Sequence, residues 1–133
     1  MNLPKFTHVT PSTLEETLKL LKESGGHSTI LAGGTDVIVA MKQRTCVPDI
    51  IINIKSLGKL ALIRPDPDGS MRIGPLTTLE SIAASDVIRQ RYPILAQAAD
   101  KVGSSQIRNA ATLGGNICLN TRCWYYNQSA VWR

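Results

Sequence analysis

The stretch Leu31-Ala32-Gly33-Gly34-Thr35-Asp36-Val37 follows a short β-branched, apolar run and leads into residues 36–43, which have helical spacing. The order of strand, glycine turn and helix indicates an α/β unit. Two successive glycines let neighbouring N–H groups turn the same way, and the start of a helix adds the positive end of its dipole. The backbone here is a candidate nest for a phosphate oxygen, although a tight turn without a ligand is the simpler alternative for this motif alone.

Two polar side chains belong to the same stretch. The hydroxyl of Thr35 would add a donor to the predicted nest. The carboxylate of Asp36 would repel a phosphate, so we expect it to cap the helix or to point to a ribose or an ordered water.

A second glycine pair occurs much further along the chain, in Thr112-Leu113-Gly114-Gly115-Asn116. Neither pair belongs to a G-x-G-x-x-G fingerprint. A β-bulge or a close crossing of two backbones is the alternative for the second pair. Thr112 and Asn116 nevertheless flank it as hydroxyl and amide donors. Two nests of this kind could hold one diphosphate between them.

Composition narrows the function classes. The 133 residues are 43% hydrophobic and 19% charged, as is typical of one globular unit. The longest apolar run, Val37–Met41, is far shorter than the roughly 18 residues of a membrane span, and no secretory pattern is present. We therefore expect a cytoplasmic protein that does not enter the membrane.

The chain carries a net charge of +5. Its Lys and Arg residues are scattered and its aromatic residues are few, which argues against binding of nucleic acid. We expect the basic surface to face an anionic cofactor or an acidic partner subunit.

The cysteines are Cys46, Cys118 and Cys123, and an odd number without a signal peptide argues against a disulfide framework. Cys118 and Cys123 have the spacing of the first two ligands of some iron–sulfur sites. Two unrelated free thiols are the alternative. We expect Cys46 to be structural.

The first part of the chain predicts a small α/β lobe over residues 1–54. A short strand at 5–9 precedes a helix, for which Ser12 and Glu15 form a candidate capping box. Leu14, Leu18 and Leu21 form its apolar stripe, which we expect to pack against a sheet, and a glycine pair ends it. The apolar run 49–54 predicts a strand covered on both faces of a parallel sheet.

Residues 55–133 predict a second, α+β lobe. A proline and Asp-Gly turn between 60–64 and 70–74 indicates an antiparallel hairpin. Three successive helices are expected over 77–84, 86–92 and 93–102. Residues 103–109 show neither the helical nor the strand period, so we expect a loop or a strand entry there.

Taken together, Ile30 to Asp36 and Gln106 to Ile117 resemble the two FAD-diphosphate loops of the flavin subunit of the molybdenum hydroxylases, a family that includes xanthine and carbon monoxide dehydrogenases. The resemblance implies a two-lobed FAD-binding fold of the α/β (α+β) class. It implies partner subunits that carry the molybdenum cofactor and [2Fe–2S] centres. The residues that it assigns to FAD are Leu31, Ala32, Gly33, Gly34, Thr35, Asp36, Val37, Thr112, Leu113, Gly114, Gly115 and Asn116.

The tail from Cys118 to Ser129 resembles an insertion that carries an extra [4Fe–4S] cluster in the β subunit of the 4-hydroxybenzoyl-CoA reductases. The resemblance implies that Cys118 and Cys123 are two of four cluster ligands. It also implies that electrons pass from a ferredoxin-type donor through the cluster and FAD toward molybdenum, for reductive removal of a phenolic hydroxyl.

The sequence therefore predicts an N-terminal piece of a flavin- and iron–sulfur-carrying electron-transfer subunit, with little activity alone. The flavin subunit of a xanthine or carbon monoxide dehydrogenase, with incidental cysteines, is one alternative. A nucleotide-binding or assembly module without catalysis is the other.

Overall fold

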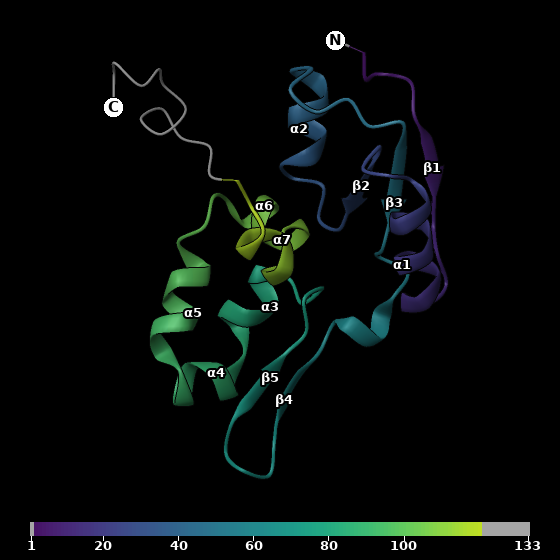
Figure 1. Cartoon of the computed structure of the whole chain (residues 1–133). Coiled ribbons are helices and arrows are strands. Elements are labelled where there is room, and N and C mark those ends of the chain that lie inside the picture. Colours follow the sequence, from purple (N-terminus) through teal and green to yellow (C-terminus); the bar gives the residue numbers. More distant parts are fainter. Residues whose placement is uncertain (1, 121–133) are drawn as a thin grey trace, which may run out of the picture.

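A computed structural model describes residues 2–120, and Cys123 lies outside that range. The described chain forms a parallel sheet of three strands, an antiparallel pair of strands and a series of helices (Figure 1). The elements are β1 Thr7–Val9, α1 Leu14–Glu23, β2 Ser28–Leu31, α2 Val37–Lys42, β3 Ile50–Asn53, a 3-10 helix Gly58–Leu60, β4 Ile63–Pro65, β5 Met71–Ile73, α3 Leu79–Ala84, α4 Asp86–Arg91, α5 Pro93–Asp100, α6 Ser105–Ala110 and α7 Leu113–Ile117.

The parallel sheet has the order β1-β3-β2, with β3 in the centre. His8 and Thr29 both pair with Ile51 in the parallel registers of the two outer strands. Ile51 and Ile52 point to opposite faces and are 2% and 0% exposed, so both faces of the central strand are covered. The prediction of a parallel sheet with a doubly covered strand is confirmed.

The N-cap of helix α1 is Thr13, one residue later than the predicted N-cap Ser12. The hydroxyl of Thr13 accepts a hydrogen bond from the Glu16 N–H at 3.1 Å, and the Glu16 carboxylate accepts one from the Ser12 N–H at 2.7 Å. The Ser12 backbone and hydroxyl bonds lower the pKa of Glu16. Glu15 was therefore the wrong partner, because Thr13 rather than Ser12 takes the N-cap position.

The prediction that the leucine stripe of α1 packs inward is also wrong. Leu14 and Leu18 are 47% and 58% exposed, and Thr17 is the buried residue of this helix, at 3%. The Thr17 hydroxyl donates to the Thr13 carbonyl at 2.9 Å, which removes the cost of burying it. Leu21 is half-buried. A satisfied threonine therefore takes the inward position that the spacing assigned to leucines.

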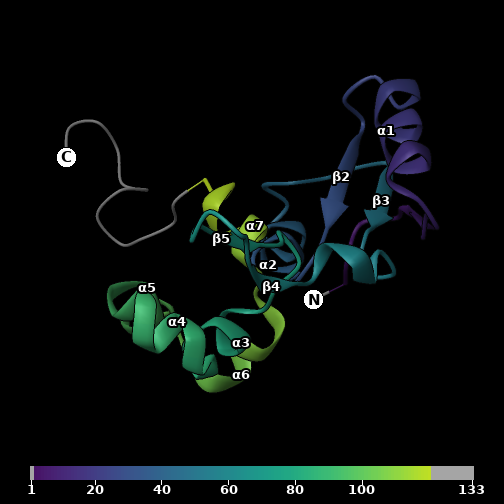
Figure 2. The ribbon, with the colours of Figure 1, turned by 90° about the horizontal axis from the view of Figure 1, so that it is seen from below.

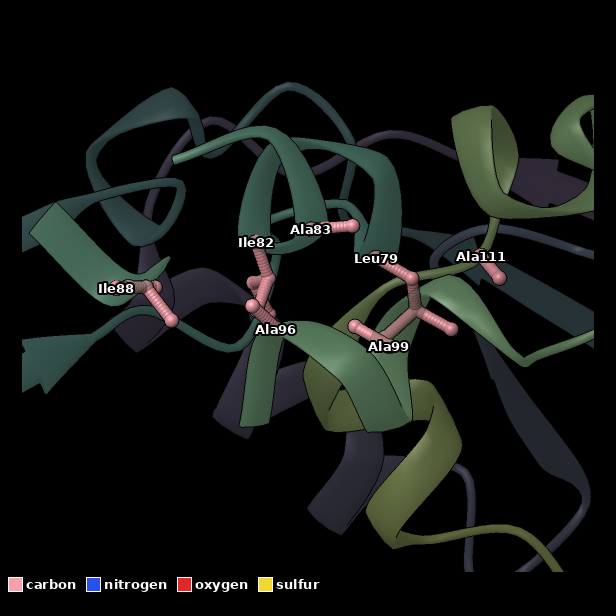
Figure 3. Close-up of a cluster of buried hydrophobic side chains, with 7 residues drawn as sticks. All are labelled: Leu79, Ile82, Ala83, Ile88, Ala96, Ala99 and Ala111. Atoms are coloured by element: carbon pink, nitrogen blue, oxygen red, sulfur yellow. The ribbon is translucent and has the colours of Figure 1, made fainter. Parts of the chain in front are cut away.

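The second half matches the predicted hairpin and three helices. Strands β4 and β5 pair antiparallel, with Ile63 opposite Ile73. Helices α3, α4 and α5 surround a buried cluster, and small side chains on α5 let it approach α3 closely. Figure 3 shows this cluster, with Ala111 at its end; its members are Leu79, Ile82, Ala83, Ile88, Ala96, Ala99 and Ala111.

The prediction of a loop or strand entry at 103–109 is wrong, because residues 105–110 form α6. Gly103, with φ of 52°, turns the chain, and the Ser104 hydroxyl accepts a hydrogen bond from the Ile107 N–H at 3.3 Å. This N-cap signal identifies a helix too short to show a hydrophobic period.

The two views place the parallel sheet and α1 on one side of the molecule and α3 to α5 on the other (Figures 1 and 2). None of the helices between residues 2 and 120 combines the length and apolar character that a bilayer crossing requires.

The buried cluster gives a stability prediction. Replacement of Ile82, which is 0% exposed, with alanine should lower the free energy of unfolding by about 2–5 kcal/mol, because the deleted methyl groups leave a cavity. The matched control is Ile94→Ala on α5, since Ile94 is 81% exposed. Urea denaturation monitored by circular dichroism measures both, and equal effects of the two variants would show that the cluster is not the stabilising core.

Candidate functional site

The two glycine loops meet in the structure. A Cβ added at Gly33 would overlap the carbonyl oxygen of Ala110 and would come within 2.9 Å of the Ala111 Cα atom. Gly33 follows β2, whereas Ala110 and Ala111 end α6 just before the second glycine pair. The expectation that distant glycine motifs form one site therefore has a structural basis, since a backbone contact joins them. We call this the Gly33–Ala110 contact.

The first loop has backbone donors that the described protein does not use. Its residues are half-buried, and Gly34 has a φ of 81°, in the left-handed region that favours glycine. The loop turns into α2 through a hydrogen bond from the Ile38 N–H to the Gly34 carbonyl, at 3.2 Å. Within residues 2–120, no protein acceptor is bonded to the N–H groups of Ala32, Gly33, Gly34, Thr35 and Val37.

Asp36 takes the N-cap position of α2, but its carboxylate makes no capping hydrogen bond to that helix. Of the roles considered for Asp36, side-chain capping is therefore wrong. A role toward a ribose or an ordered water stays a prediction.

The second loop differs, because its N–H groups donate within the protein. The Leu113 N–H donates to the Thr77 carbonyl at 2.9 Å, and the Gly114 N–H donates to the Pro75 carbonyl at 2.8 Å. The Gly115 N–H donates to the Thr112 hydroxyl at 3.2 Å. The second glycine pair therefore lies in the first turn of α7, which Thr112 caps, and does not form an open nest. Contacts between a ligand and Thr112 to Asn116 remain a prediction. Such contacts would have to use groups other than the N–H groups that already donate within the protein.

Position 114 requires glycine because two chain segments approach closely there. A Cβ at this position would lie 2.8 Å from the Pro75 Cβ. Alongside it, Thr78 and Thr112 form an antiparallel bridge, and the Leu79 N–H donates to the Ala111 carbonyl at 3.0 Å. The close crossing of two backbones, an alternative for this motif, is what the structure shows.

A pocket that the sequence did not indicate lies beside the second loop. Its volume is about 270 Å³, which is just below the roughly 300–1,000 Å³ of small-molecule sites and too small for a whole dinucleotide. Lys55 contributes a cationic side chain to its lining. The lining residues are Lys55, Gly58, Ala61, Leu76, Thr78, Asn109, Ala110 and Thr112.

The predicted cluster ligands are only partly described. Cys118 is exposed and caps the C-terminal end of α7, whereas Cys123 falls beyond residue 120. Within residues 2–120, His, Cys, Asp and Glu side chains form no group of three or more that could hold a metal ion. Cys46 is half-buried, with its sulfur 3.7 Å from the Thr29 hydroxyl.

Residues 4–124 match the family described as the FAD binding domain in molybdopterin dehydrogenase. The chain belongs to this family. A FAD-subunit of nicotinate dehydrogenase from Eubacterium barkeri is 40% identical over 117 residues, which are 87% of this chain and 39% of that protein. A FAD-binding subunit of xanthine dehydrogenase from Escherichia coli is 36% identical over 107 residues, 80% of this chain and 36% of that protein.

Solved structures of the molybdopterin dehydrogenase family share the fold. A carbon monoxide dehydrogenase from Hydrogenophaga pseudoflava, in a form that lacks the Mo-pyranopterin moiety, has a chain that superimposes with a TM-score of 0.84 and 32% identity. The match covers 88% of this chain and 40% of that one. The α/β FAD-binding fold and the resemblance to the molybdenum hydroxylase flavin subunits are thereby confirmed. The chain spans about two fifths of the length of these relatives.

The Gly33–Ala110 contact gives a prediction on packing. Gly33→Ala should lower the free energy of unfolding by about 1–3 kcal/mol, because the added methyl group meets backbone atoms that cannot rotate away. Gly58→Ala is the matched control, since a Cβ at Gly58 has nothing within 4 Å. Thermal denaturation of both variants provides the measurement, and a Gly33 variant as stable as the control would mean that the two loops are not in contact.

Proposed function

We propose that this chain forms the FAD-diphosphate-binding part of an electron-transfer subunit of a molybdenum-containing dehydrogenase. The observation that carries the proposal concerns the N–H groups of Gly33, Gly34 and Thr35, which have no acceptor among residues 2–120 and lie beside the second loop. Membership of a FAD-binding family supports it. Neutral N–H donors suit a diphosphate because they bind negative charge without requiring a buried cation.

The first loop has donors that fit a diphosphate, and the second loop is placed to support it. The N–H groups of Gly33, Gly34 and Thr35 would donate to phosphate oxygens. The second loop, fixed by Thr77 and Pro75, would provide the opposite wall. FAD, when bound, supplies the one- and two-electron chemistry, and this chain supplies its binding and orientation.

We propose partner subunits that carry the molybdenum cofactor and [2Fe–2S] centres, as the resemblance implies. The names of the relatives support the dehydrogenase class, because they are subunits or chains of nicotinate, xanthine and carbon monoxide dehydrogenases. These names refer to different substrates, so the proposal stops at the class. A cytoplasmic location belongs to the same proposal. A nucleotide-binding module without catalysis is the remaining alternative.

A narrower hypothesis assigns the chain to 4-hydroxybenzoyl-CoA reductase, with a [4Fe–4S] cluster and a ferredoxin-type donor. It rests on the tail motif that begins at Cys118 and includes Cys123. The exposure of the Cys118 thiol, immediately after α7, is compatible with a ligand position close to the second loop. The xanthine or carbon monoxide dehydrogenase type is the competing assignment.

The diphosphate assignment can be tested by amide NMR of the full-length subunit. Addition of FAD should move the amide protons of Gly33, Gly34 and Thr35 downfield, because they gain acceptors. The amide protons of Gly114 and Gly115 should move less, since they already donate within the protein. ADP should reproduce the first-loop shifts, and riboflavin, which has no phosphate, should not. Equal shifts with riboflavin would rule out diphosphate binding there.

The cluster hypothesis can be tested by iron content. Reconstitution of the full-length subunit with iron and sulfide should give bound iron that is lost in Cys118→Ser and Cys123→Ser, because thiolates hold such clusters. Cys46→Ser is the matched control, since Cys46 lies half-buried beside Thr29. Unchanged iron content in both tail variants would eliminate the narrower hypothesis and leave the FAD proposal intact.

A further inference from the structure

Arg108 forms a charged link among three helices. It lies on α6, and its Nε donates to the Glu80 carboxylate of α3 at 2.9 Å. Its Nη2 lies 3.4 Å from a carboxylate oxygen of Asp100, the last residue of α5. The Arg108 side chain is 14% exposed, so water screens these contacts less than it screens an ordinary surface pair. The planar guanidinium can serve both carboxylates at once.

Helix α6 lies against α3 but buries little apolar surface there. It contains no buried residue, and its largest apolar side chain, Ile107, is 40% exposed. A short helix of this kind gains most of its stability from tertiary packing. Within residues 2–120, its other side-chain hydrogen bonds, at Ser104, Ser105 and Asn109, are local to α6 and do not connect it to α3 or α5. The Arg108 link is therefore the main side-chain attachment of α6 to the helical cluster.

The placement of α6 determines where the two loops meet. Ala110, which Gly33 contacts, is two residues after Arg108, and the second loop begins at Thr112. On the far side of the contact, the chain is fixed by the Leu79–Ala111 and Thr77–Leu113 hydrogen bonds. Arg108 thus holds the near end of a segment whose far end is held by backbone bonds.

We propose that Arg108 is a positioning residue, which holds α6 so that the two glycine loops stay in contact and keep the FAD-diphosphate site in shape. Its effect on FAD rests on the proposed function. Arg108 acts through Ala110 and the second loop and does not itself touch the diphosphate. A role limited to the stability of the helical cluster is the competing explanation.

The test uses Arg108→Met in the full-length subunit, which removes the charge and keeps most of the side-chain length. In the subunit without FAD, hydrogen exchange of the Leu113, Gly114 and Ile38 amides should become about tenfold faster, because local opening of the loops becomes easier. FAD affinity should fall about tenfold. Arg108→Lys should recover part of both losses, since a lysine can still pair with one carboxylate.

The control is Arg89→Met. Arg89 lies on α4 in the same helical cluster, and its Nε donates to the Ala83 carbonyl at 2.7 Å. This variant should lower the melting temperature while loop exchange and FAD affinity stay unchanged. Similar loop exchange and FAD affinity in both variants would assign Arg108 to general stability and overturn the proposal.

Two further outcomes are distinct. If Arg108→Met leaves loop exchange unchanged, the positioning role is wrong whatever the FAD affinity. If the wild-type subunit binds no FAD, the proposed function fails, and the effect on FAD fails with it. If hydrogen exchange is then faster in Arg108→Met but not in Arg89→Met, the result supports only the part of the proposal in which Arg108 keeps the two loops in contact.

Discussion

The candidate site depends on a backbone contact that is too close for any side chain. Gly33 comes from the edge of a parallel sheet, and Ala110 and Ala111 come from the end of a helix that packs elsewhere. Because a Cβ at position 33 would overlap a carbonyl oxygen, the loops cannot approach this way unless that residue is glycine. The contact couples the sheet to the helical cluster, since a shift of either part displaces the loop carried by the other.

The two glycine pairs have opposite roles although their sequences are similar. The first pair leaves a parallel strand at its carboxyl end, where the described chain has no neighbouring strand that continues, so its N–H groups have no acceptor among the described residues. The second pair lies in the first turn of a helix and beside the segment 75–79, where the Pro75 carbonyl accepts from the Gly114 N–H, while the Thr112 hydroxyl accepts from the Gly115 N–H. A Gly-Gly step thus allows either an anion nest or a close backbone crossing, and its neighbours in space decide between them.

Elements with a strong local signal could be predicted from the sequence. The apolar strand at 50–53, the Asp-Gly hairpin and the three helices after it all follow local patterns. The inward face of α1 could not be predicted, because a self-satisfied Thr17 and two exposed leucines reverse the usual order of burial. For the site, the loops themselves were visible in the sequence. The bridge between Thr78 and Thr112 and the partners of Arg108 depend on residues distant in sequence, which no local pattern encodes.

Two kinds of interaction support the second loop: apolar packing in the helical cluster and the ion pairs of Arg108. The fully buried part of the cluster ends at Ala111, Leu113 packs against it while only half-buried, and the residues from Gly114 to Cys118 are half-buried or exposed. If apolar packing continued along α6 and past Leu113 into the rest of the second loop, it would cover the polar groups that a ligand needs. An arginine on two carboxylates fixes α6 without covering the loop, because its two partners belong to α3 and α5. Charge pairing therefore positions this segment while the edge of the site stays accessible, as a binding loop on a rigid scaffold requires.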